Sequence, residues 1–316
     1  MKSYFNNQLQ FIIAKYKINT LLISISGGQD SLCLIKIIEN LKKNKVIYKV
    51  HYIYIDHQWN IKSKKQILHL INYIKQYKSQ MTIYQIHNYA LSESIARSNR
   101  YHILINYAIK NQYQYILTAH TQTDKIETFL YNLIRGTSID GATSLIPHRE
   151  IDSHLHIFRP FLLISRINTN WFCRKFCLPI WSDYSNYNLY IKRNRIRNEL
   201  IPYLKNYFNI NVENKIVNFL MLSNEDNEYI KQNSMKLYLK SRHKYFIALN
   251  YEQIKHQHIT LKKRTLQLFF FHNFNINLSI NYINQLIFKL DQCILDHIIK
   301  YKNLDIIIKQ PWIYIK

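Results

Sequence analysis

Apolar residues in the first 146 positions alternate between two kinds of segment. Short runs rich in β-branched and aromatic residues, which are typical of strands, lie at 20–26, 46–56, 81–87 and 114–120. Longer segments with apolar residues three and four positions apart, which are typical of amphipathic helices, lie at 30–43, 62–78, 92–110 and 122–134. The alternation predicts an α/β fold, in which βαβ units form a parallel sheet with helices on both faces.

Polar clusters follow three of the predicted strands. They are SGGQDS at 26–31, Asp56-His57, and Ala119-His120. Ligands of such sheets bind outside the carboxyl ends of the strands. We therefore expect the three clusters to meet along one edge.

The pattern changes after Pro147, the first proline in the chain. From about residue 200 the spacing is helical and the composition is rich in Asn, Lys and Tyr. We expect a catalytic domain at 1–203 and a smaller, mostly helical domain at 204–316. The terminal DIIIKQPWIYIK is typical of a short hairpin or strand.

Composition adds information about partners and source. The chain has 4 glycines, 26 tyrosines and a formal net charge of +24, and such a charge favours a polyanionic partner such as nucleic acid. Heavy use of Ile, Lys, Asn and Tyr indicates an A/T-rich genome, as in an organelle or a reduced bacterium. Codon drift explains Lys more easily than Arg. The cluster of Arg193, Arg195 and Arg197 is therefore the stronger signal, although a solvated helix face is the alternative.

Cysteine usage and apolar runs indicate the compartment. Four cysteines are too few for a disulfide framework in 316 residues, which favours a reducing environment. Cys173 and Cys177, with His154 and His156 upstream, lack zinc-finger spacing, and an apolar helix face explains the cysteines more simply. No signal peptide and no 18-residue apolar stretch is present, so we expect a soluble, intracellular protein that spans no membrane.

The SGGQDS segment has the features of a phosphate-binding loop. Gly27 and Gly28 permit positive φ and close approach of a ligand to the backbone. The helix that follows directs N–H groups at an anion, and Ser26 and Ser31 add hydroxyl donors. A tight turn capped by Ser or Asp is the alternative, but a glycine-poor chain would lose an idle glycine. The segment matches neither a Walker A motif nor GxGxxG.

SGGQDS resembles the SGGxDS loop of the PP-loop (N-type) ATP pyrophosphatases, which cleave ATP between the α and β phosphates. Further segments resemble, in order, elements of the tRNA(Ile)-lysidine synthetases within that superfamily. The match runs from about residue 20 to 203 and includes all four glycines. Its segments are IDHQWN, ESIARSNRYHIL, TAHTQTDKIET, LIRGTSIDGATSL, RPFL and DYSN…RNRIRNELIP.

The resemblance implies a PP-loop fold and a ligase that uses ATP and Mg²⁺. In that reaction the wobble cytidine of tRNA(Ile) with a CAU anticodon is adenylated, and free L-lysine then attacks C2 through its ε-amine to form lysidine. The product changes codon reading from AUG to AUA and identity from Met to Ile. The resemblance assigns the ATP-binding residues as Ser26, Gly27, Gly28, Gln29, Asp30 and Ser31, with Asp56 and His57 at the adenosine side or edge.

The TAHTQTDKIET element departs from the family pattern AHH-x-DDQ-x-ET. Thr121, Thr123 and Lys125 replace a His, an Asp and a Gln, so that Asp124 alone remains of the acidic pair. We therefore expect Mg²⁺ to be held mainly by ATP phosphates and Asp30. His120, Asp124 and Glu127 have the spacing of one helix face, and we expect His120 and Asp124 to be catalytic. Capping boxes starting at Thr121 or Asp124 are the alternative.

Arginines complete the set of candidate residues. Arg100, with Arg97 as the second candidate, would stabilise charge on the α-phosphate, although a solvated helix face is the alternative. Glu127, Arg135 and Gly136 are secondary candidates within the family pattern. Arg193, Arg195 and Arg197 are candidates for contacts with tRNA phosphates. On a helix, Arg193 and Arg197 share a face and Arg195 does not.

Two other functions stay open. A tRNA-thiolating enzyme of the same superfamily would need a reactive cysteine near the loop, and Cys33 lies on the following helix. A non-catalytic tRNA-binding derivative would explain the reduced acidic element. We expect a plastid stroma if the gene is organellar and a bacterial cytoplasm otherwise. The sequence leaves the oligomeric state open, a homodimer included.

Overall fold

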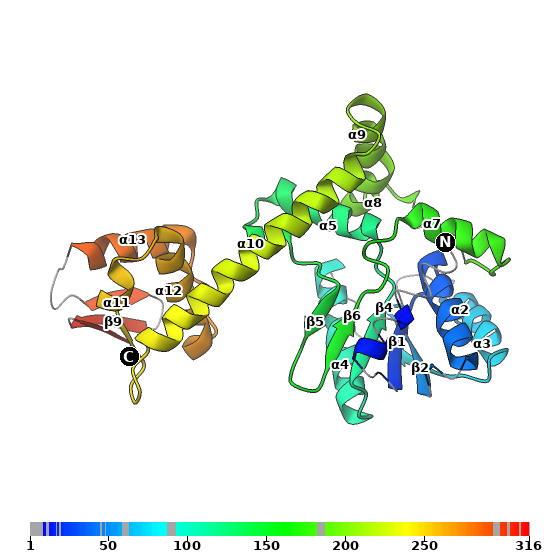
Figure 1. The fold of residues 1–316 in the computed structure, drawn as a ribbon, viewed down its shortest axis with the longest axis horizontal. Helices are drawn as coiled ribbons and strands as arrows, with labels where there is room; N and C mark the ends of the chain where they lie inside the picture. Colours follow the sequence, from blue (N-terminus) through cyan, green and yellow to red (C-terminus); the bar gives the residue numbers. More distant parts are fainter. Residues whose placement is uncertain are drawn as a thin grey trace. The chain divides into compact units, whose positions relative to one another are not determined.

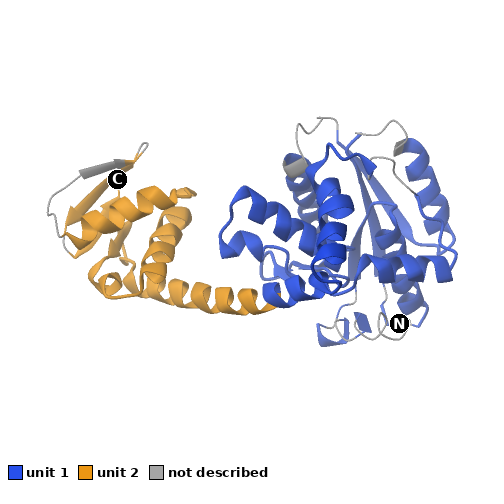
Figure 2. Ribbon diagram, turned by 90° about the horizontal axis from the view of Figure 1, so that it is seen from above, with its two compact units in different colours: residues 1–220 blue, residues 221–316 orange. Residues whose placement is uncertain are grey.

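The computed structural model describes most of the chain, in two compact units formed by residues 1–220 and 221–316 (Figure 2). The described ranges are 9–10, 13–16, 18, 20–44, 46–47, 49–58, 63–86, 93–181, 187–292, 298–301, 304–309 and 311–315. Residues 59–60 and 183–186 of the sequence motifs lie outside them. The α10 helix (Val212–Ser241) begins in the first unit and ends in the second.

Unit 1 contains the predicted strand–helix alternation. The strands are β1 (Thr20–Ile25), β2 (Lys49–Asp56), β3 (Gln80–Gln85) and β4 (Tyr115–Thr118). The helices are α2 (Gln29–Lys43), α3 (Ser63–Lys75), α4 (Glu93–Lys110) and α5 (Gln122–Arg135). The four strands pair in parallel, so the predicted α/β fold is confirmed.

The sheet has six strands in the order β3-β2-β1-β4-β6-β5. Strand β6 (His156–Phe158) is parallel to β4, whereas β5 (His148–Glu150) is antiparallel to β6. The sheet is therefore mostly parallel rather than wholly parallel. Strand β1 lies between β2 and β4 although β4 follows β3 in the chain, and this reversal of strand order opens a crevice at the carboxyl ends of β1 and β4.

Hydrophobic cores cover both faces of this sheet. Alternate residues of a strand point to opposite faces. Leu21, Ile23 and Ile25 accordingly pack in one core with α2, α3 and α7 (Arg166–Lys175), and Leu22 packs in the other core with α4. Figure 1 shows α2 and α3 on one side of the strands and α4 on the other. Strands buried on both faces hold the loops at their ends in place.

A continuous helical stretch follows α7 and the short α6 (Ile139–Ala142). It consists of α8 (Lys192–Arg195), a π-helical turn η2 (Ile196–Leu200) and α9 (Ile201–Tyr207). Pro202 lacks the N–H that would donate to the carbonyl four residues earlier. The π-helical turn η2, which is wider than an α-helical turn, ends directly before α9, the helix that contains this proline. Ile196 and Ile201 pack against α5 and the start of α10, which brings η2 to the sheet's ligand-binding edge.

Unit 2 combines helices with a four-stranded antiparallel sheet. The sheet order is β7-β10-β9-β8. The elements are β7 (Ala248–Asn250), α11 (Glu252–Lys255), α12 (Ile259–Phe274), α13 (Ile280–Asp291), β8 (Ile298–Tyr301), β9 (Leu304–Lys309) and β10 (Trp312–Ile315). The predicted terminal hairpin is β9–β10, whereas β7 and β8 were not predicted. None of the described helices has the length and apolar content to cross a membrane.

Candidate active site

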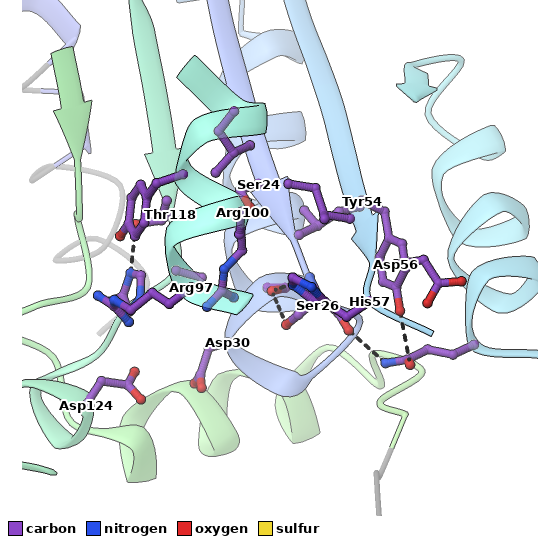
Figure 3. Close-up of a pocket in the computed structure, with 18 of the residues that line it drawn as sticks. Ser24, Ser26, Asp30, Tyr54, Asp56, His57, Arg97, Arg100, Thr118 and Asp124 are labelled. Carbon is purple, nitrogen blue, oxygen red and sulfur yellow. Dashed lines mark hydrogen bonds between the residues drawn. The ribbon is translucent and has the colours of Figure 1, made fainter. Parts of the chain in front are cut away.

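A cavity of about 460 Å³ lies at the carboxyl ends of the strands in unit 1 (Figure 3). Ser26, Asp30 and Ser31 line it after β1, Asp56 and His57 at the end of β2, and His120 and Asp124 after β4. The three polar clusters therefore meet at one edge, as predicted. Its volume is within the range of small-molecule sites.

Hydrogen bonds hold the loop after β1 in its bent shape. The Ser26 N–H donates to Ser31 Oγ at 3.1 Å, and the two hydroxyls are 3.0 Å apart. Gln66 Nε2 of α3 donates to the Ser26 carbonyl at 2.7 Å. The Tyr54 hydroxyl donates to Gln66 Oε1 at 3.3 Å. The loop is thus fixed to β2 and α3 and needs little reorganisation to receive a ligand.

The two adjacent glycines have different roles. Gly27 has φ +80°, and a Cβ there would lie 2.9 Å from Gln66 Nε2 and 3.2 Å from Leu70 Cδ1. Gly28 has φ −73° as the N-cap of α2, and the nearest heavy atom to a Cβ would be Ser26 Oγ at 3.8 Å. The fold therefore requires glycine at Gly27. Neither the φ of Gly28 nor the distance to its nearest neighbouring atom requires glycine there. The absence of a side chain at Gly28 suits close approach of a ligand to the backbone.

The first residues of α2 also contact α7. Gln29 Nε2 donates to the Arg166 carbonyl at 3.1 Å and to Thr169 Oγ1 at 3.2 Å, so this side chain ties the loop to α7. Thr169 Oγ1 donates to Asp30 Oδ1 at 2.5 Å, and Arg166 Nε is 3.6 Å from Asp30 Oδ2. Burial raises the pKa of Asp30, and Arg166 and Thr169 partly offset this.

Helix α4 supplies two arginines and a tyrosine to the cavity, which are Arg97, Arg100 and Tyr101. The Arg97 guanidinium lies over the Tyr101 ring, 5.4 Å from its centroid. Tyr101 Oη accepts a hydrogen bond from Arg159 Nη2 at 3.1 Å. Burial opposes ionisation of Tyr101, but Arg159 and Arg97 outweigh it and lower the pKa of the phenol. This wall of the cavity is strongly positive and suits phosphate.

His120 and Asp124 lie together after β4 but not on one helix face. The α5 helix begins at Gln122, so the expectation of a helical His120 was wrong. His120 Nδ1 is 2.8 Å from Thr118 Oγ1. Burial lowers the pKa of His120 well below 6.5, and Arg97, Arg159 and Arg100 reinforce this against the effect of Asp124. The imidazole is therefore neutral at pH 7.

Asp124 forms the predicted capping box. Its Oδ2 accepts from the Thr121 backbone N–H at 2.8 Å, and Thr121 Oγ1 accepts from the Asp124 N–H at 3.5 Å. Burial opposes the charge of Asp124, but Arg193, the Thr121 N–H and Arg197 hold its pKa below the usual range. The residue is both a helix cap and an ionised carboxylate at the cavity, so the two interpretations of the motif are compatible.

Glu127 does not line the cavity. Its carboxylate is fully buried and pairs with Arg193 Nε at 3.0 Å and with Arg197 Nη2 at 2.9 Å. Arg193 and Arg197 do line the cavity, on the shared face that was predicted. Arg195 points elsewhere and pairs with Glu199 at 3.0 Å. A contact with tRNA phosphates stays a prediction for all three arginines.

Two secondary candidates lie at the far end of α5. Gly136 is its C-cap, with φ +78°, and a Cβ added there would meet no heavy atom within 4 Å. Arg135 is exposed, with its guanidinium 5.3 Å from the Tyr131 ring centroid. Neither lines the cavity, so the geometry gives them no direct part in its chemistry.

Carboxylates line the cavity, and one cysteine lies on α2. Among the described residues, no group of three or more His, Cys, Asp and Glu side chains is arranged to hold a metal ion. Asp30 and Asp124 both line the cavity, and the charge of Asp124 helps to raise the pKa of Asp30. Cys33 is fully buried in α2, and burial raises the pKa of its thiol. It is therefore a poor nucleophile.

Comparisons with known proteins agree with this geometry. The PP-loop domain family matches residues 1–204. The chain is 47% identical to the chloroplastic tRNA(Ile)-lysidine synthase of Gracilaria tenuistipitata var. liui, over 99% of both chains. The chain belongs to the tRNA(Ile)-lysidine synthase family. It is also 38% identical to the chloroplastic synthase of Pyropia yezoensis, over 94% of this chain and 90% of that one.

Other relatives of this tRNA(Ile)-lysidine synthase family member extend the comparison. The synthase of Nostoc sp. (strain PCC 7120) is 40% identical over 69% of this chain and 63% of its own length. Among solved structures, the U34-tRNA thiolase NcsA from Methanococcus maripaludis has a TM-score of 0.54 at 14% identity, covering 69% of this chain and 78% of its own. That likeness shows the fold alone.

Two of the three departures of this family member from the AHH-x-DDQ pattern, Thr121 and Thr123, have structural roles. Thr121 caps α5. Thr123 Oγ1 accepts a hydrogen bond from the Arg166 N–H at 3.4 Å, joining α5 to α7. Lys125 is buried, and burial lowers its pKa. The element keeps its position at the cavity with a single acidic side chain, Asp124, facing it.

The sequence analysis missed several residues of the site, chiefly Gln66, Arg166 and Thr169. A signal exists for Gln66, because it lies four residues before Leu70 and so on the apolar stripe of its helix. A polar residue in such a stripe indicates a buried partner, here the glycine loop. Arg166 and Thr169 reach Asp30 from more than 130 residues away in sequence, and no local pattern marks them.

Proposed function

We propose that the protein ligates free L-lysine to C2 of the wobble cytidine of tRNA(Ile) with anticodon CAU, using ATP. The cavity carries this proposal, because it joins a phosphate-binding loop, a positive wall and the His120–Asp124 pair in one compartment. Full-length similarity to chloroplastic tRNA(Ile)-lysidine synthases supports the same reaction. The product lysidine changes codon reading from AUG to AUA and tRNA identity from methionine to isoleucine.

In the first step the C2 oxygen of the cytidine attacks the α-phosphorus of ATP, and pyrophosphate leaves. The N–H groups at the start of α2, with Ser26 and Ser31, bind the phosphates that depart. Arg100, assisted by Arg97, stabilises the negative charge that develops on the α-phosphate. Asp56 and His57 lie at the end of β2, and we assign them to the adenosine side of the cavity.

In the second step the ε-amine of lysine attacks C2, and AMP leaves with the electrons of the C2–O bond. Asp124 is ionised and attracts the lysine ammonium. The neutral His120 accepts the proton that the amine must lose. Nδ1 of His120 is hydrogen-bonded to the Thr118 hydroxyl, so we assign the proton from the amine to Nε2. The low pKa of His120 requires the proton to pass on to solvent before the next turnover.

We infer that Mg²⁺ accompanies ATP. Asp30 and Asp124 are the carboxylates that fit it, because Mg²⁺ in nucleotide sites takes one or two carboxylates and completes its shell with phosphate oxygens and water. The ion neutralises phosphate charge when it is bound. A stromal location is supported by the chloroplastic relatives, and we assign residues 204–316 to tRNA binding.

Incorporation of labelled lysine into a tRNA(Ile) CAU transcript, with pyrophosphate release, tests the proposal. Asp124→Ala and Arg100→Ala should each lower the rate at least 100-fold. No incorporation by the wild type would refute the lysine reaction, whatever ATP binding showed. Wild-type rates in both variants would instead refute the site assignment. Thiolation is disfavoured by the buried Cys33.

A further inference from the structure

Three aromatic side chains form a cluster on the surface at the end of α9. The ring centroids of Tyr203 and Tyr207 are 4.9 Å apart, and those of Tyr203 and Phe208 are 5.9 Å apart. Tyr203 is 52% exposed, Tyr207 74% and Phe208 71%. Large apolar side chains gathered in solvent mark interaction sites more often than single exposed ones do.

The cluster is not part of the core of unit 1. The α9 helix contributes Ile201 to the core with α5 and α10, where Val217 and Leu220 also pack. Tyr203, Tyr207 and Phe208 lie outside that core. Folding of unit 1 therefore does not explain the three rings.

Exposed basic residues lie on the elements of unit 1 that precede and follow α9. Lys192 and Arg195 are exposed on α8, in the same helical stretch, and Lys215 is exposed on α10. Arg195 pairs with Glu199, but the whole chain carries +24. Aromatic rings among cations are the surface that single-stranded RNA uses, with bases on the rings and phosphates on the cations.

The same helical stretch also forms a wall of the cavity. Arg193, Asn194 and Arg197 line the cavity from α8 and η2. Tyr207 follows Arg197 by ten residues, which is about 15 Å along a helix. Figure 1 shows α8 and α9 in succession, with α5 beside α8. An RNA loop held on the rings would therefore have neighbouring nucleotides close to the cavity.

We propose that Tyr203, Tyr207 and Phe208 form a stacking platform for unpaired bases of the tRNA loop that delivers its cytidine to the cavity. The inference rests on the proposed function for the identity of the RNA. Stacking on the platform holds the loop while one base is turned into the cavity, because a base must leave its stack before it can react. The platform binds bases through their faces and so selects unpaired RNA rather than sequence.

Binding of a tRNA(Ile) CAU transcript to the full chain, measured by fluorescence anisotropy without ATP or lysine, tests the platform. The double variant Tyr207→Ala/Phe208→Ala should raise the Kd at least tenfold. The slope of log Kd against log salt should stay unchanged, because no phosphate contact is removed. Tyr207→Phe should bind like the wild type, and so should Tyr84→Ala, which alters an exposed tyrosine on β3.

Three outcomes would overturn the platform. One is a Kd of the double variant within twofold of the wild type. Another is a wild-type dimer that becomes a monomer in the double variant with tRNA affinity unchanged, which would make the cluster a self-association surface. The third is a loss of thermal stability with unchanged tRNA affinity, which would place the rings in intramolecular packing. Absence of lysine incorporation would refute the proposed function, but the binding assay would still decide the platform.

Discussion

Glu127 of α5 and Arg197 of η2 form a bidentate ion pair inside unit 1. Arg197 Nε donates to Oε1 at 2.5 Å and Nη2 donates to Oε2 at 2.9 Å. The Glu127 carboxylate is fully buried and also accepts from Arg193 Nε. One carboxylate thus holds two arginines at the cavity wall, Arg193 of α8 and Arg197 of η2. Burial of its charge is compensated only while both partners are present.

Removing the charge of Glu127 should destabilise unit 1. Glu127→Gln would leave Arg193 and Arg197 partly buried without their carboxylate, and we expect the free energy of unfolding to fall by about 2 kcal/mol. Urea denaturation followed by circular dichroism measures this change. Glu199→Gln is the matched control, because its pair with Arg195 is exposed and should change stability by less than about 0.5 kcal/mol. Equal effects of the two variants would contradict the assignment.

The two glycines of the loop should respond differently to alanine. Gly27→Ala should lower the free energy of unfolding by about 1–2 kcal/mol, because of its positive φ and the contact of a Cβ with Gln66. Gly28→Ala should leave stability within about 0.5 kcal/mol and raise the KM for ATP. Thermal unfolding and ATP-dependent pyrophosphate release measure the two effects. If Gly28→Ala bound ATP as the wild type does, close approach of phosphate there would be excluded.

Stability should depend on pH through His120. Its pKa in the folded protein is lowered from 6.5, so between that lowered value and about 6.5 the unfolded chain binds a proton that the folded chain does not. The contribution of His120 to the free energy of unfolding should therefore be constant above a pH of about 6.5. It should fall as the pH falls below that value. His51, His57 and His148 act in the same direction.

His120→Gln isolates the share of one histidine. Urea unfolding at pH 7.5 and pH 5.5 should show a smaller loss of stability in His120→Gln than in the wild type, because the variant has no group to titrate at this position. Identical losses would mean that His120 carries its proton in the folded protein at pH 5.5, which would contradict its role as the neutral base.

Thr169 should control the ionisation of Asp30. Its hydroxyl donates to the Asp30 carboxylate and so lowers the pKa that burial raises. Thr169→Val removes this hydrogen bond, and the pKa of Asp30 should rise further above its usual range. The acidic limb of pyrophosphate release against pH should move upward by the same amount. A profile with the wild-type acidic limb would show that ionised Asp30 is not required.

Local patterns were sufficient for the strand–helix alternation from β1 to α5 and insufficient for the shortest strands. The runs from β1 to α5 are long enough for their periodicity to identify them. Strands β5 and β6 have three residues each, as does β7, and so few positions carry no distinguishable period. They form because a neighbouring strand supplies hydrogen-bond partners, and this depends on the folded sheet.

The amino-acid sequence alone determined the order of elements, the glycine loop after β1 and the cap at Thr121. It therefore also determined the edge of the sheet at which the cavity lies. These features depend on neighbouring residues, through backbone conformation and helix periodicity. The folded chain was needed to show that Thr169 contacts Asp30 across 139 residues and that Arg197 pairs with Glu127 across 70. Such pairs are set by how helices pack on the sheet, and packing depends on the whole chain rather than on any local pattern.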